Sequence, residues 1–539
     1  MSDTAAPTPS TPTPAAPAPS GPSGPSGPQA DPHILGSYDP SRRWLGLATL
    51  TFSLLAITTD MTILNVAIPQ MAADLQPTAS QQLWIIDAYS LVMAGLLISM
   101  SSIADRWGRK RMLMLGYVLI ALASVLVLFA HSPGFVIALR VLLGVGAAMV
   151  MPSTLSLLRV TFTDTRERAT ALAVWAAVAG IGAAVGPLLG GFLLETFDWR
   201  AAFLVSVPMM AIAFVSAIFT IPESRVPEPG PWDPFGALLT LLGMTTSMWA
   251  IKQFSEEGSL TYLPAWIAFG IGVTAIVVFV RRCLNSDAPL LDVTMFRHRI
   301  FSAGVLAALI ASFSMSAGLL LLAQWLQLVN GASAFESGLQ LMPLALAAAV
   351  TSLLAPVLSE RIGMRATIFL ALFIAGAGMM VLGVRGENLE LTSVFISLAL
   401  IGAGIGALAL ASSMIMGGVP RSKAGNAAAM EDTAYEFGAV LGIAILGSLA
   451  SFLYRREIGI PPETLAMGAD ATDAVRDSLG GAVAVAEAAH LPDLAARAGD
   501  AFTSGMGLTG LIGGLVLLAF AFVVFFLTPK GTMLGDLEH

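Results

Sequence analysis

Charged residues are scarce in this sequence. Asp, Glu, Lys and Arg make up 12% of its 539 residues, about half the share found in soluble domains. Histidine occurs five times, always outside the long apolar runs, and no Ser/His/Asp set or nucleotide-binding motif stands out. The single cysteine, Cys283, excludes an intramolecular disulfide and a cysteine-based metal site. We therefore expect no enzymatic activity, no metal, no nucleic-acid partner and no cofactor.

Residues 1–40 lack any apolar run and consist mainly of Pro, Ser, Ala, Gly and Thr. Such a composition cannot bury a core, which predicts a disordered tail on the cytoplasmic side. The segment also lacks a basic region followed by an apolar stretch, so it is not expected to be a signal peptide.

Hydrophobic residues dominate the rest of the chain: they make up 56% of the sequence, and the mean hydropathy is +0.80. Repeated apolar runs of about 20 residues indicate transmembrane helices rather than the alternating pattern of a barrel. The sequence therefore predicts an all-α membrane protein with fourteen transmembrane helices. The expected spans are 44–70, 82–103, 112–130, 135–158, 169–194, 201–221, 234–252, 262–281, 300–328, 337–358, 366–384, 392–417, 426–450 and 505–528.

Basic residues are concentrated on alternate connections between these spans. The short connections expected outside contain only Arg200, Lys252 and Arg385. Those expected inside contain Arg106, Arg109, Lys110, Arg111, Arg159, Arg166, Arg168, Arg225, Arg281, Arg282, Arg297, Arg299, Arg361, Arg365, Arg421 and Lys423. By the positive-inside rule both termini are cytoplasmic, as an even number of spans also requires.

The first span contains an acid, Asp60, within the stretch Thr58–Pro69. A charge at the bilayer centre costs about 2.5–3.5 kcal/mol on insertion scales, so it needs a partner, a water-filled cavity or a proton. We expect Asp60 to line a transport cavity and to hold alternately a proton and a positively charged solute.

A tight basic turn follows the second span and contains Asp105, Arg106, Gly108, Arg109 and Lys110. Asp105 is suited to pair with an arginine or with a helix N-terminus across the bundle, which would form a latch that breaks as the domains rock. The alternative is an ordinary positive-inside loop. A degenerate echo appears after the tenth span, over 359–365.

The echo, eight spans after the original, is what duplicated halves with two inserted helices would produce. It predicts an N-terminal six-helix bundle over 41–221, two inserted transmembrane helices with linkers over 222–298, and a C-terminal six-helix bundle over 299–528. A cytoplasmic tail, 529–539, follows. The C-terminal bundle includes a long outer segment, 451–504, with helix-like runs near 473–489 and 494–502. This segment is either a surface cap or a gate over the outer mouth.

These motifs resemble those of the major facilitator superfamily. The turn over 101–111 resembles the superfamily's Gly-x-Leu-Ala-Asp-Arg-x-Gly-Arg-Lys motif, with Ser101 in place of the first Gly. The Asp60 stretch, with Asn65 and Pro69, resembles the first-helix signature of the fourteen-helix drug:proton antiporters, and within that group the chain looks most like QacA-type multidrug exporters. The likeness extends from about 43 to 529, including 81–90, 167–175 and 422–429.

The fifth span contains Gly182, Gly186, Pro187, Gly190 and Gly191. Glycines at four-residue spacing let two helix backbones approach closely, and a proline frees a carbonyl and kinks a helix. Small-residue packing alone is one interpretation. The pattern also resembles the motif of exporters, which implies an outward direction of transport.

Arg140 and Asp87 are charges in the outer parts of the fourth and second spans. A buried guanidinium needs a carboxylate or carbonyl partner, and the family resemblance implies that Arg140 relays charge. Snorkelling of Arg140 to the headgroups is the alternative. Asp87 is either a solvated interfacial acid or an outer-vestibule group that attracts or releases cations.

The thirteenth span contains three acids within six residues: Glu431, Asp432 and Glu436. Repulsion between neighbouring carboxylates favours a proton on at least one of them. A structural polar patch is the alternative, while the family resemblance implies that Glu431 and Glu436 serve substrate or proton binding. Further candidates for the cavity lining are Met61, Asn65, Tyr89, Trp175, Phe313, Trp325 and Tyr435, although ordinary packing would explain any one of them.

Together, these features predict a proton-driven multidrug efflux antiporter that exports lipophilic cations, such as quaternary ammonium antiseptics, dyes and biguanide-like compounds, by alternating access. We expect a monomeric, multi-pass protein surrounded by lipid in the bacterial cytoplasmic membrane. The tenth span has no acid after Glu336, so a preference for monovalent or divalent cations stays open. A same-fold exporter of one physiological antibiotic, metabolite or lipid is the alternative, whereas a channel or receptor has no support.

Overall fold

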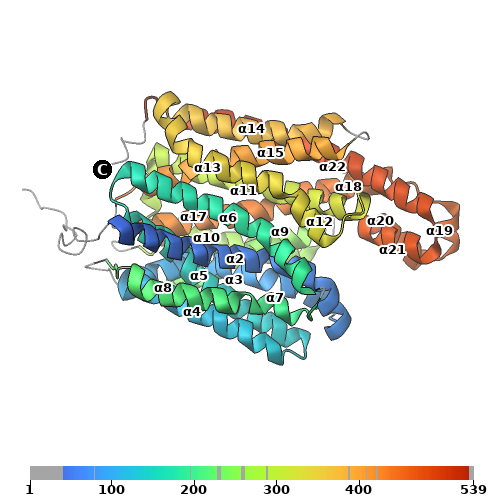
Figure 1. The fold of residues 1–539 in the computed structure, drawn as a ribbon, viewed down its shortest axis with the longest axis horizontal. Coiled ribbons are helices and arrows are strands. Elements are labelled where there is room, and N and C mark those ends of the chain that lie inside the picture. The colour runs from blue at the N-terminus through green and yellow to red at the C-terminus, as the bar shows by residue number, and fades with distance from the viewer. Residues whose placement is uncertain are drawn as a thin grey trace, which may run out of the picture. The chain divides into compact units, whose positions relative to one another are not determined.

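The computed structural model describes residues 40–77, 79–194, 196–226, 232–256, 262–286, 289–385, 389–407, 409–420 and 423–532. The predicted N-terminal tail up to residue 39 and the last residues, 533–539, lie outside this part of the chain. Within it every regular element is helical and no strand occurs, which confirms the all-α prediction (Figure 1).

Thirteen helical stretches of the described residues are long and apolar enough to cross a membrane. The fifth predicted span is occupied by α6 (Thr165–Leu194), a helix of 30 residues that is not among the thirteen. Several helices continue past the predicted spans, because polar residues at a membrane boundary do not end a helix. The clearest case is α22 (Pro492–Leu527), which begins thirteen residues before the predicted span.

Two sets of helices follow the same packing scheme. The first set consists of α2 (Pro40–Leu75), α3 (Ala79–Trp107), α4 (Arg109–Leu126), α5 (Pro133–Thr161), α6, α7 (Arg200–Leu204) and α8 (Ser206–Thr220). Within it α2 packs on α6, α3 on α5, and α4 on both α5 and α8.

The second set repeats these pairs along the later part of the chain. It consists of α11 (Arg299–Gln324), α12 (Ala334–Gln340), α13 (Met342–Ile362), α14 (Met364–Arg385), α15 (Leu391–Ala407), α16 (Ala409–Gly417), α17 (Ala424–Gly442), α18 (Ser448–Glu457) and α22. Here α11 packs on α17, α13 on α15, and α14 on both α15 and α22. The two sets meet where α17 contacts α3 and α5, and where α6 contacts α13.

Between the two sets, α9 (Pro234–Glu256) and α10 (Leu263–Leu284) form an antiparallel pair, and α9 packs on α3. Where α9 begins and α10 ends, the Arg282 guanidinium donates two hydrogen bonds to Asp233, at 2.7 and 3.1 Å. These hydrogen bonds, the largest influence on the carboxyl group, lower the pKa of Asp233.

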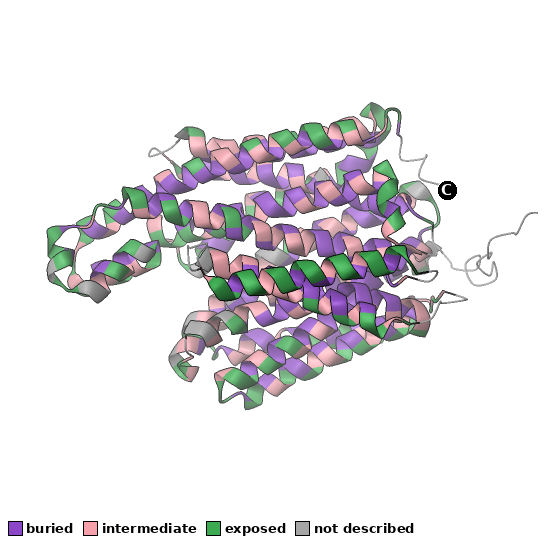
Figure 2. Cartoon of the chain, turned by 180° about the vertical axis from the view of Figure 1, so that it is seen from behind, coloured by how far each residue is buried: buried purple, intermediate pink, exposed green. Residues whose placement is uncertain are grey.

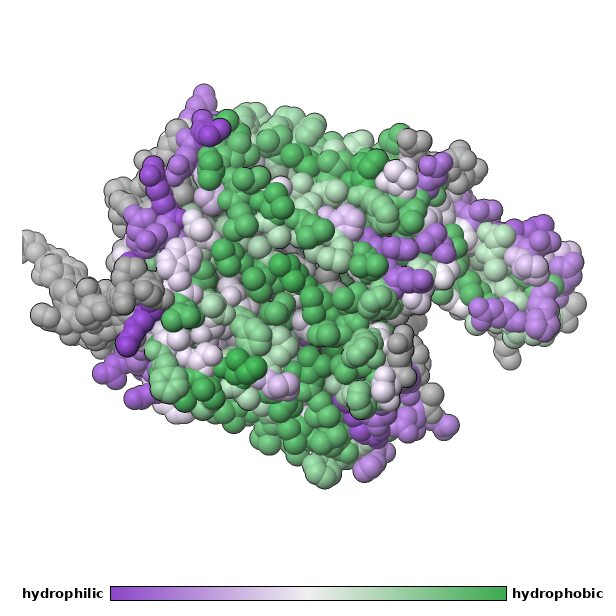
Figure 3. All heavy atoms as spheres, viewed as in Figure 1, coloured by the Kyte–Doolittle hydropathy of each residue, from purple (hydrophilic) through white to green (hydrophobic). Residues whose placement is uncertain are grey.

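Buried residues line the helix faces that meet inside the bundle, and exposed residues lie on the outer faces (Figure 2). In Figure 3 hydrophobic side chains cover the middle of the visible face, while hydrophilic ones gather toward its two ends. This banding is the surface expected of a protein in a bilayer, where the hydrocarbon core accepts apolar side chains.

The long segment predicted over 451–504 is mostly helical. It contains the end of α18, then α19 (Pro462–Ala466), α20 (Ala469–Asp477), α21 (Leu479–Ala489) and the first turns of α22. The Tyr454 hydroxyl donates to the backbone carbonyls of Val475, at 2.9 Å, and Ser478, at 3.3 Å, which ties α18 to the α20–α21 connection. These helices extend beyond the membrane helices at the right of Figure 1.

Candidate functional site

Asp60 lies on α2 with only 5% of its surface exposed. One carboxylate oxygen is 3.7 Å from the Arg140 guanidinium of α5, and the other accepts a hydrogen bond from Ser206 of α8 at 3.2 Å. Three helices of the first set therefore meet at this carboxylate. Because a buried charge is costly without a partner, the Arg140 charge accounts for the position of Asp60.

Arg140 is itself fixed by α3. Its Nε donates to the Ile85 carbonyl at 2.9 Å and one terminal nitrogen to the Ile86 carbonyl at 3.4 Å, while the guanidinium lies 4.6 Å from the centre of the Tyr89 ring. The nitrogen facing Asp60, Nη1, makes no hydrogen bond within the described structure. The pair is thus close enough for electrostatic attraction but not hydrogen-bonded.

The glycines of α6 set the position of the helix that carries Asp60. A Cβ at Gly182 or Gly186 would overlap the hydroxyls of Thr58 or Thr62, and at Gly186 it would also lie 2.8 Å from the Thr59 carbonyl oxygen. A Cβ at Gly190 would lie 3.0 Å from Ile63.

These glycines let α2 approach α6 without intervening side chains. Gly191 faces the other way, toward Phe335 of α12 in the second set. The side chains of Pro187 and Asn65 lie outside the described part of the structure, so their predicted roles stay predictions.

The three acids of the thirteenth predicted span lie on α17. Glu431 is fully buried and accepts a hydrogen bond from Ser412 of α16, and Asp432 is 3% exposed. One oxygen of each carboxyl group has no hydrogen-bond partner among the described residues, and no ion pair of that part of the chain includes either residue. Two buried acids without a cation are thus held side by side.

Glu436, one turn further along α17, is half-buried. Lys252 of α9 lies within electrostatic range of Glu436 and forms an ion pair with Asp87 of α3. Tyr89 is buried, its ring lies against the Arg140 guanidinium, and Asp60 and Glu436 are both within electrostatic range of it. The structure therefore brings the acids of both helix sets toward one buried region.

The other candidate lining residues differ in their surroundings. Met61 and Tyr435 are partly exposed. Trp175 donates its indole N–H to Thr154 at 3.4 Å, Trp325 donates to Thr503 at 3.0 Å, and Phe313 packs with Ala317 and Leu446. Packing within each helix set accounts for these last three side chains.

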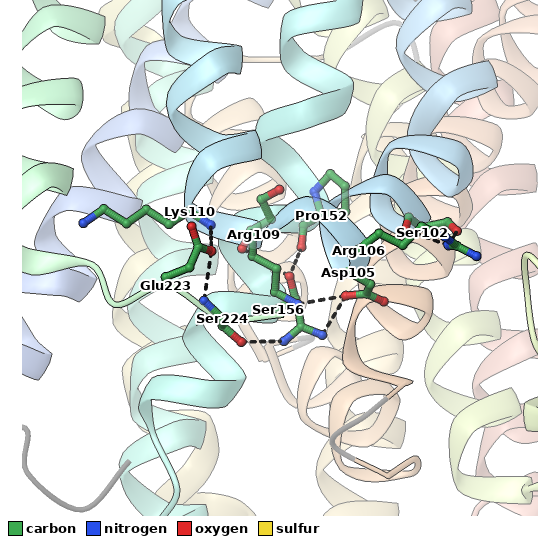
Figure 4. A network of polar contacts seen from close by, with 10 residues as sticks. Ser102, Asp105, Arg106, Arg109, Lys110, Pro152, Ser156, Glu223 and Ser224 are labelled. Carbon is green, nitrogen blue, oxygen red and sulfur yellow. Dashed lines mark hydrogen bonds and ion pairs between the residues drawn. The ribbon is translucent and has the colours of Figure 1, made fainter. Parts of the chain in front are cut away.

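The basic turn after α3 is shown in Figure 4. Arg109 bridges Asp105, at 2.8 Å, and the Ser224 side chain, at 3.4 Å, while the backbone N–H of Lys110 donates to Glu223 at 3.1 Å. Arg106 points away from them and donates to Ser102. Gly108 has φ of +115°, a backbone conformation that favours glycine.

This turn also contacts the second helix set. A Cβ at Gly425, in the first turn of α17, would lie 2.6 and 2.8 Å from the Asp105 carboxylate oxygens. A helix N-terminus favours a negative charge, so the acid lies where α17 stabilises it. Nearby, Arg159 of α5 donates to the Val419 carbonyl, and Arg166 pairs with Glu360 at 2.9 Å. Asp105 thus lies against the N-terminus of α17, one of the two partners that the sequence suggested for it, whereas the arginine that pairs with it, Arg109, belongs to the same turn. The role of this turn as a latch stays a prediction.

Sequence reasoning missed three residues that contact the acids: Ser206, Ser412 and Lys252. The two serines resemble many others in apolar helices, so no sequence signal distinguishes them. Lys252 did carry a signal, because it is one of only three basic residues on the short outer connections.

The Major Facilitator Superfamily model matches residues 50–443. The chain belongs to the major facilitator superfamily. This confirms the resemblance seen in its motifs, and it identifies the chain as a multi-pass membrane protein of a transporter family rather than an enzyme. Among the described residues, no group of three His, Cys, Asp or Glu side chains has the arrangement of a metal site.

Relatives within the superfamily are drug-efflux and resistance proteins. The multidrug efflux pump LfrA of Mycolicibacterium smegmatis is 37% identical over 489 residues, covering 90% of this chain and 96% of LfrA. The methyl viologen resistance protein SmvA of Salmonella typhimurium is 36% identical over 459 residues, covering 84% and 90%. The solved structure of the proton:xylose symporter XylE matches with a TM-score of 0.60 and 14% identity over 93% of this chain and 99% of XylE, which shows the fold alone.

Proposed function

We propose that this protein is a proton-driven antiporter that exports lipophilic cations across the bacterial cytoplasmic membrane. The observation that carries the proposal is the two buried acids Glu431 and Asp432, which have no cation partner among the described residues and lie on α17, a helix that contacts α5, the helix of Arg140. A buried carboxylate without a cation is stable only when it holds a proton or a positively charged ligand. Alternate occupancy by the two is the exchange that an antiporter needs.

The arrangement in the membrane follows from the same proposal. With α6 as a membrane helix the chain has fourteen spans, which places both termini in the cytoplasm together with the end of the bundle that carries Asp105. That end is rich in arginine, as the positive-inside rule requires. We propose a monomer in contact with membrane lipids, with protons and small cationic drugs as its ligands.

More than one acid site is useful to such an exporter. Exchange of one monovalent cation for one proton moves no net charge, so only the pH gradient drives it. A second proton adds about 2.3 kcal/mol per 100 mV of membrane potential, as well as another pH contribution. The Asp60 pair and the α17 acids are two separate sites that support such a stoichiometry.

The test uses the purified protein in proteoliposomes with an imposed proton gradient. Addition of tetraphenylphosphonium, ethidium or methyl viologen should cause proton movement coupled to cation movement, and a protonophore should abolish it. The relatives' names motivate the multidrug panel and the choice of methyl viologen. If none of these cations moves protons but a single metabolite or antibiotic does, the protein is a narrow-substrate exporter.

A further inference from the structure

The helix α9 belongs to neither helix set and lies over the interface between them, in contact with α3 of the first set and α17 of the second. Its Met244 and Met248 are buried in one apolar cluster with Leu91 and Ala94 of α3 and Val440 of α17. The helix therefore contacts both sides of an interface that must change during alternating access. Its position lets a residue near its C-terminal end reach acids of both sets.

That residue is Lys252. Its ammonium group pairs with Asp87 of α3, and both side chains are largely buried, with 20% and 13% of their surfaces exposed. Glu436 of α17 lies within electrostatic range of the same ammonium group. Asp87 is in turn within electrostatic range of Arg140, so Lys252 extends the Asp60–Arg140 pair toward the α17 acids.

The pairing has a consequence for any cationic ligand. An ammonium on a flexible four-carbon stem offers the same two features as a lipophilic cation, one positive charge and apolar surface. While it occupies Asp87, that carboxylate attracts a second cation only weakly, and a ligand near Glu436 is repelled.

We propose that Lys252 is a tethered competitor of the exported cation: it lowers the affinity of the region around Asp87 and Glu436 for cations and so promotes their release to the outside. The inference rests on the proposed export of cations. It assigns to an inserted helix a direct part in substrate specificity, set by the charge of the substrate.

The dependence of the binding constant on the charge of the ligand distinguishes this role from a structural one. At an effective dielectric constant of about 20, one unit charge roughly 12 Å from a monovalent ligand changes its binding constant about tenfold, and that of a divalent ligand about a hundredfold. Loss of a merely structural contact would change the two affinities by the same factor, or weaken both.

The experiment measures equilibrium binding of tetraphenylphosphonium, a monocation, and methyl viologen, a dication, to the purified full-length protein at pH 8. Lys252→Met should bind the first about tenfold and the second about a hundredfold more tightly than the unmodified protein. Lys252→Arg, which keeps the charge, should bind both as the unmodified protein does. Lys252→Gln keeps a hydrogen-bond donor for Asp87 and should reproduce the gain even if the methionine variant fails to fold.

The matched control is Lys423→Met, which removes a lysine of the same kind from its pair with Asp292 far from Asp87. It should leave both affinities unchanged. Unchanged or weaker binding by the Lys252 variants, an equal gain for the two ligands, or the same gain in Lys423→Met would overturn the role of Lys252. Failure of the unmodified protein to bind either cation would instead reject the proposed cation export.

Discussion

The two helix sets share one packing scheme but differ in whether a cation pairs with their buried acids. In the first set, Asp60 has a permanent cation, Arg140, and a hydroxyl donor from a third helix. In the second, Glu431 has only the Ser412 hydroxyl, and no cation pairs with Asp432 in the described structure. Asp60 therefore has a cation of the protein beside it, whereas Glu431 and Asp432 need a proton or a cationic ligand to neutralise them.

A similar asymmetry marks the turns after α3 and α13. Both contain a glycine with positive φ, Gly108 at +115° and Gly363 at +84°. When the two turns are aligned on these glycines, Asp105 corresponds to Glu360. Asp105 is held by Arg109 of its own set, but the aligned position in the second set is Met364. Glu360 instead pairs with Arg166 across the interface, where their side chains are 40% and 80% exposed. The two turns thus share a glycine with positive φ but differ in their charged residues.

The largest effect is expected from Asp60→Asn. Loss of this charge leaves Arg140 buried without its acid, and breaking a buried pair costs about 3–5 kcal/mol. Active export in proteoliposomes should fall to background. The double variant Asp60→Asn/Arg140→Gln removes both charges and should recover thermal stability without recovering export. Full export by a folded Asp60→Asn protein would contradict the role given to this acid.

The next-largest effect is expected from the acids of α17, which lack a cation partner in the described structure. Glu431→Gln should change the profile of exported drugs more than Asp432→Asn does. Ser412 donates a hydrogen bond to one oxygen of Glu431 and leaves the other oxygen without a partner among the described residues. Asp432 is buried next to Glu431, and both burial and repulsion between neighbouring carboxylates favour a proton on it. An asparagine resembles a protonated aspartate closely.

Transport rates for monovalent and divalent cations, compared at equal protein levels in the membrane, check this prediction. We expect the relative rate for methyl viologen to fall roughly tenfold in Glu431→Gln, since one charge of the site is lost. A larger change of the profile in Asp432→Asn would reverse the assignment.

The helices and the identity of the buried acids were predictable from sequence because both depend on local patterns. Apolar runs of about 20 residues specify membrane helices, and a carboxylate inside such a run is conspicuous whatever its surroundings. The positive-φ glycine of the turn was likewise part of a recognisable local motif. Helix ends were less predictable, since α22 continues through a polar stretch that resembles a loop in hydropathy.

The partners Ser206 of Asp60 and Lys252 of Asp87 could not be predicted, because they depend on which helices become neighbours. Asp60 and Ser206 are 146 residues apart, and Lys252 lies 165 residues from Asp87. No periodicity within α9 indicates that it packs on α3 near Asp87. In the sequence the acids of α17 have no basic neighbour, whereas in the fold Lys252 of α9 comes within electrostatic range of one of them, Glu436.

A moderate effect is expected where the two sets meet at Asp105. In Gly425→Ala the new Cβ would lie 2.6 Å from an Asp105 oxygen and 2.8 Å from the Ser101 hydroxyl, which forces α17 away from α3. Export should fall about fivefold, which corresponds to the lower end of the roughly 1–3 kcal/mol cost of overpacking, with little change in cation affinity. Gly270→Ala is the matched control, since nothing lies within 4 Å of its Cβ; an equal loss in that variant would contradict the mechanism.

The smallest effect is expected from Glu360→Gln, the counterpart of Asp105 in the second set. Its partner Arg166 is mostly exposed, and exposed ion pairs contribute only about 0.2–1 kcal/mol. Export should therefore change less than about twofold, a difference that 0.5 M salt should largely remove by screening. Asp105→Asn, measured in parallel, should lose several-fold more activity, because its carboxylate is largely buried, with 13% of the side chain exposed, between Arg109 and the N-terminus of α17. Equal losses in the two variants would show that the turns act symmetrically, and that the exposed pair across the interface matters as much as the buried one.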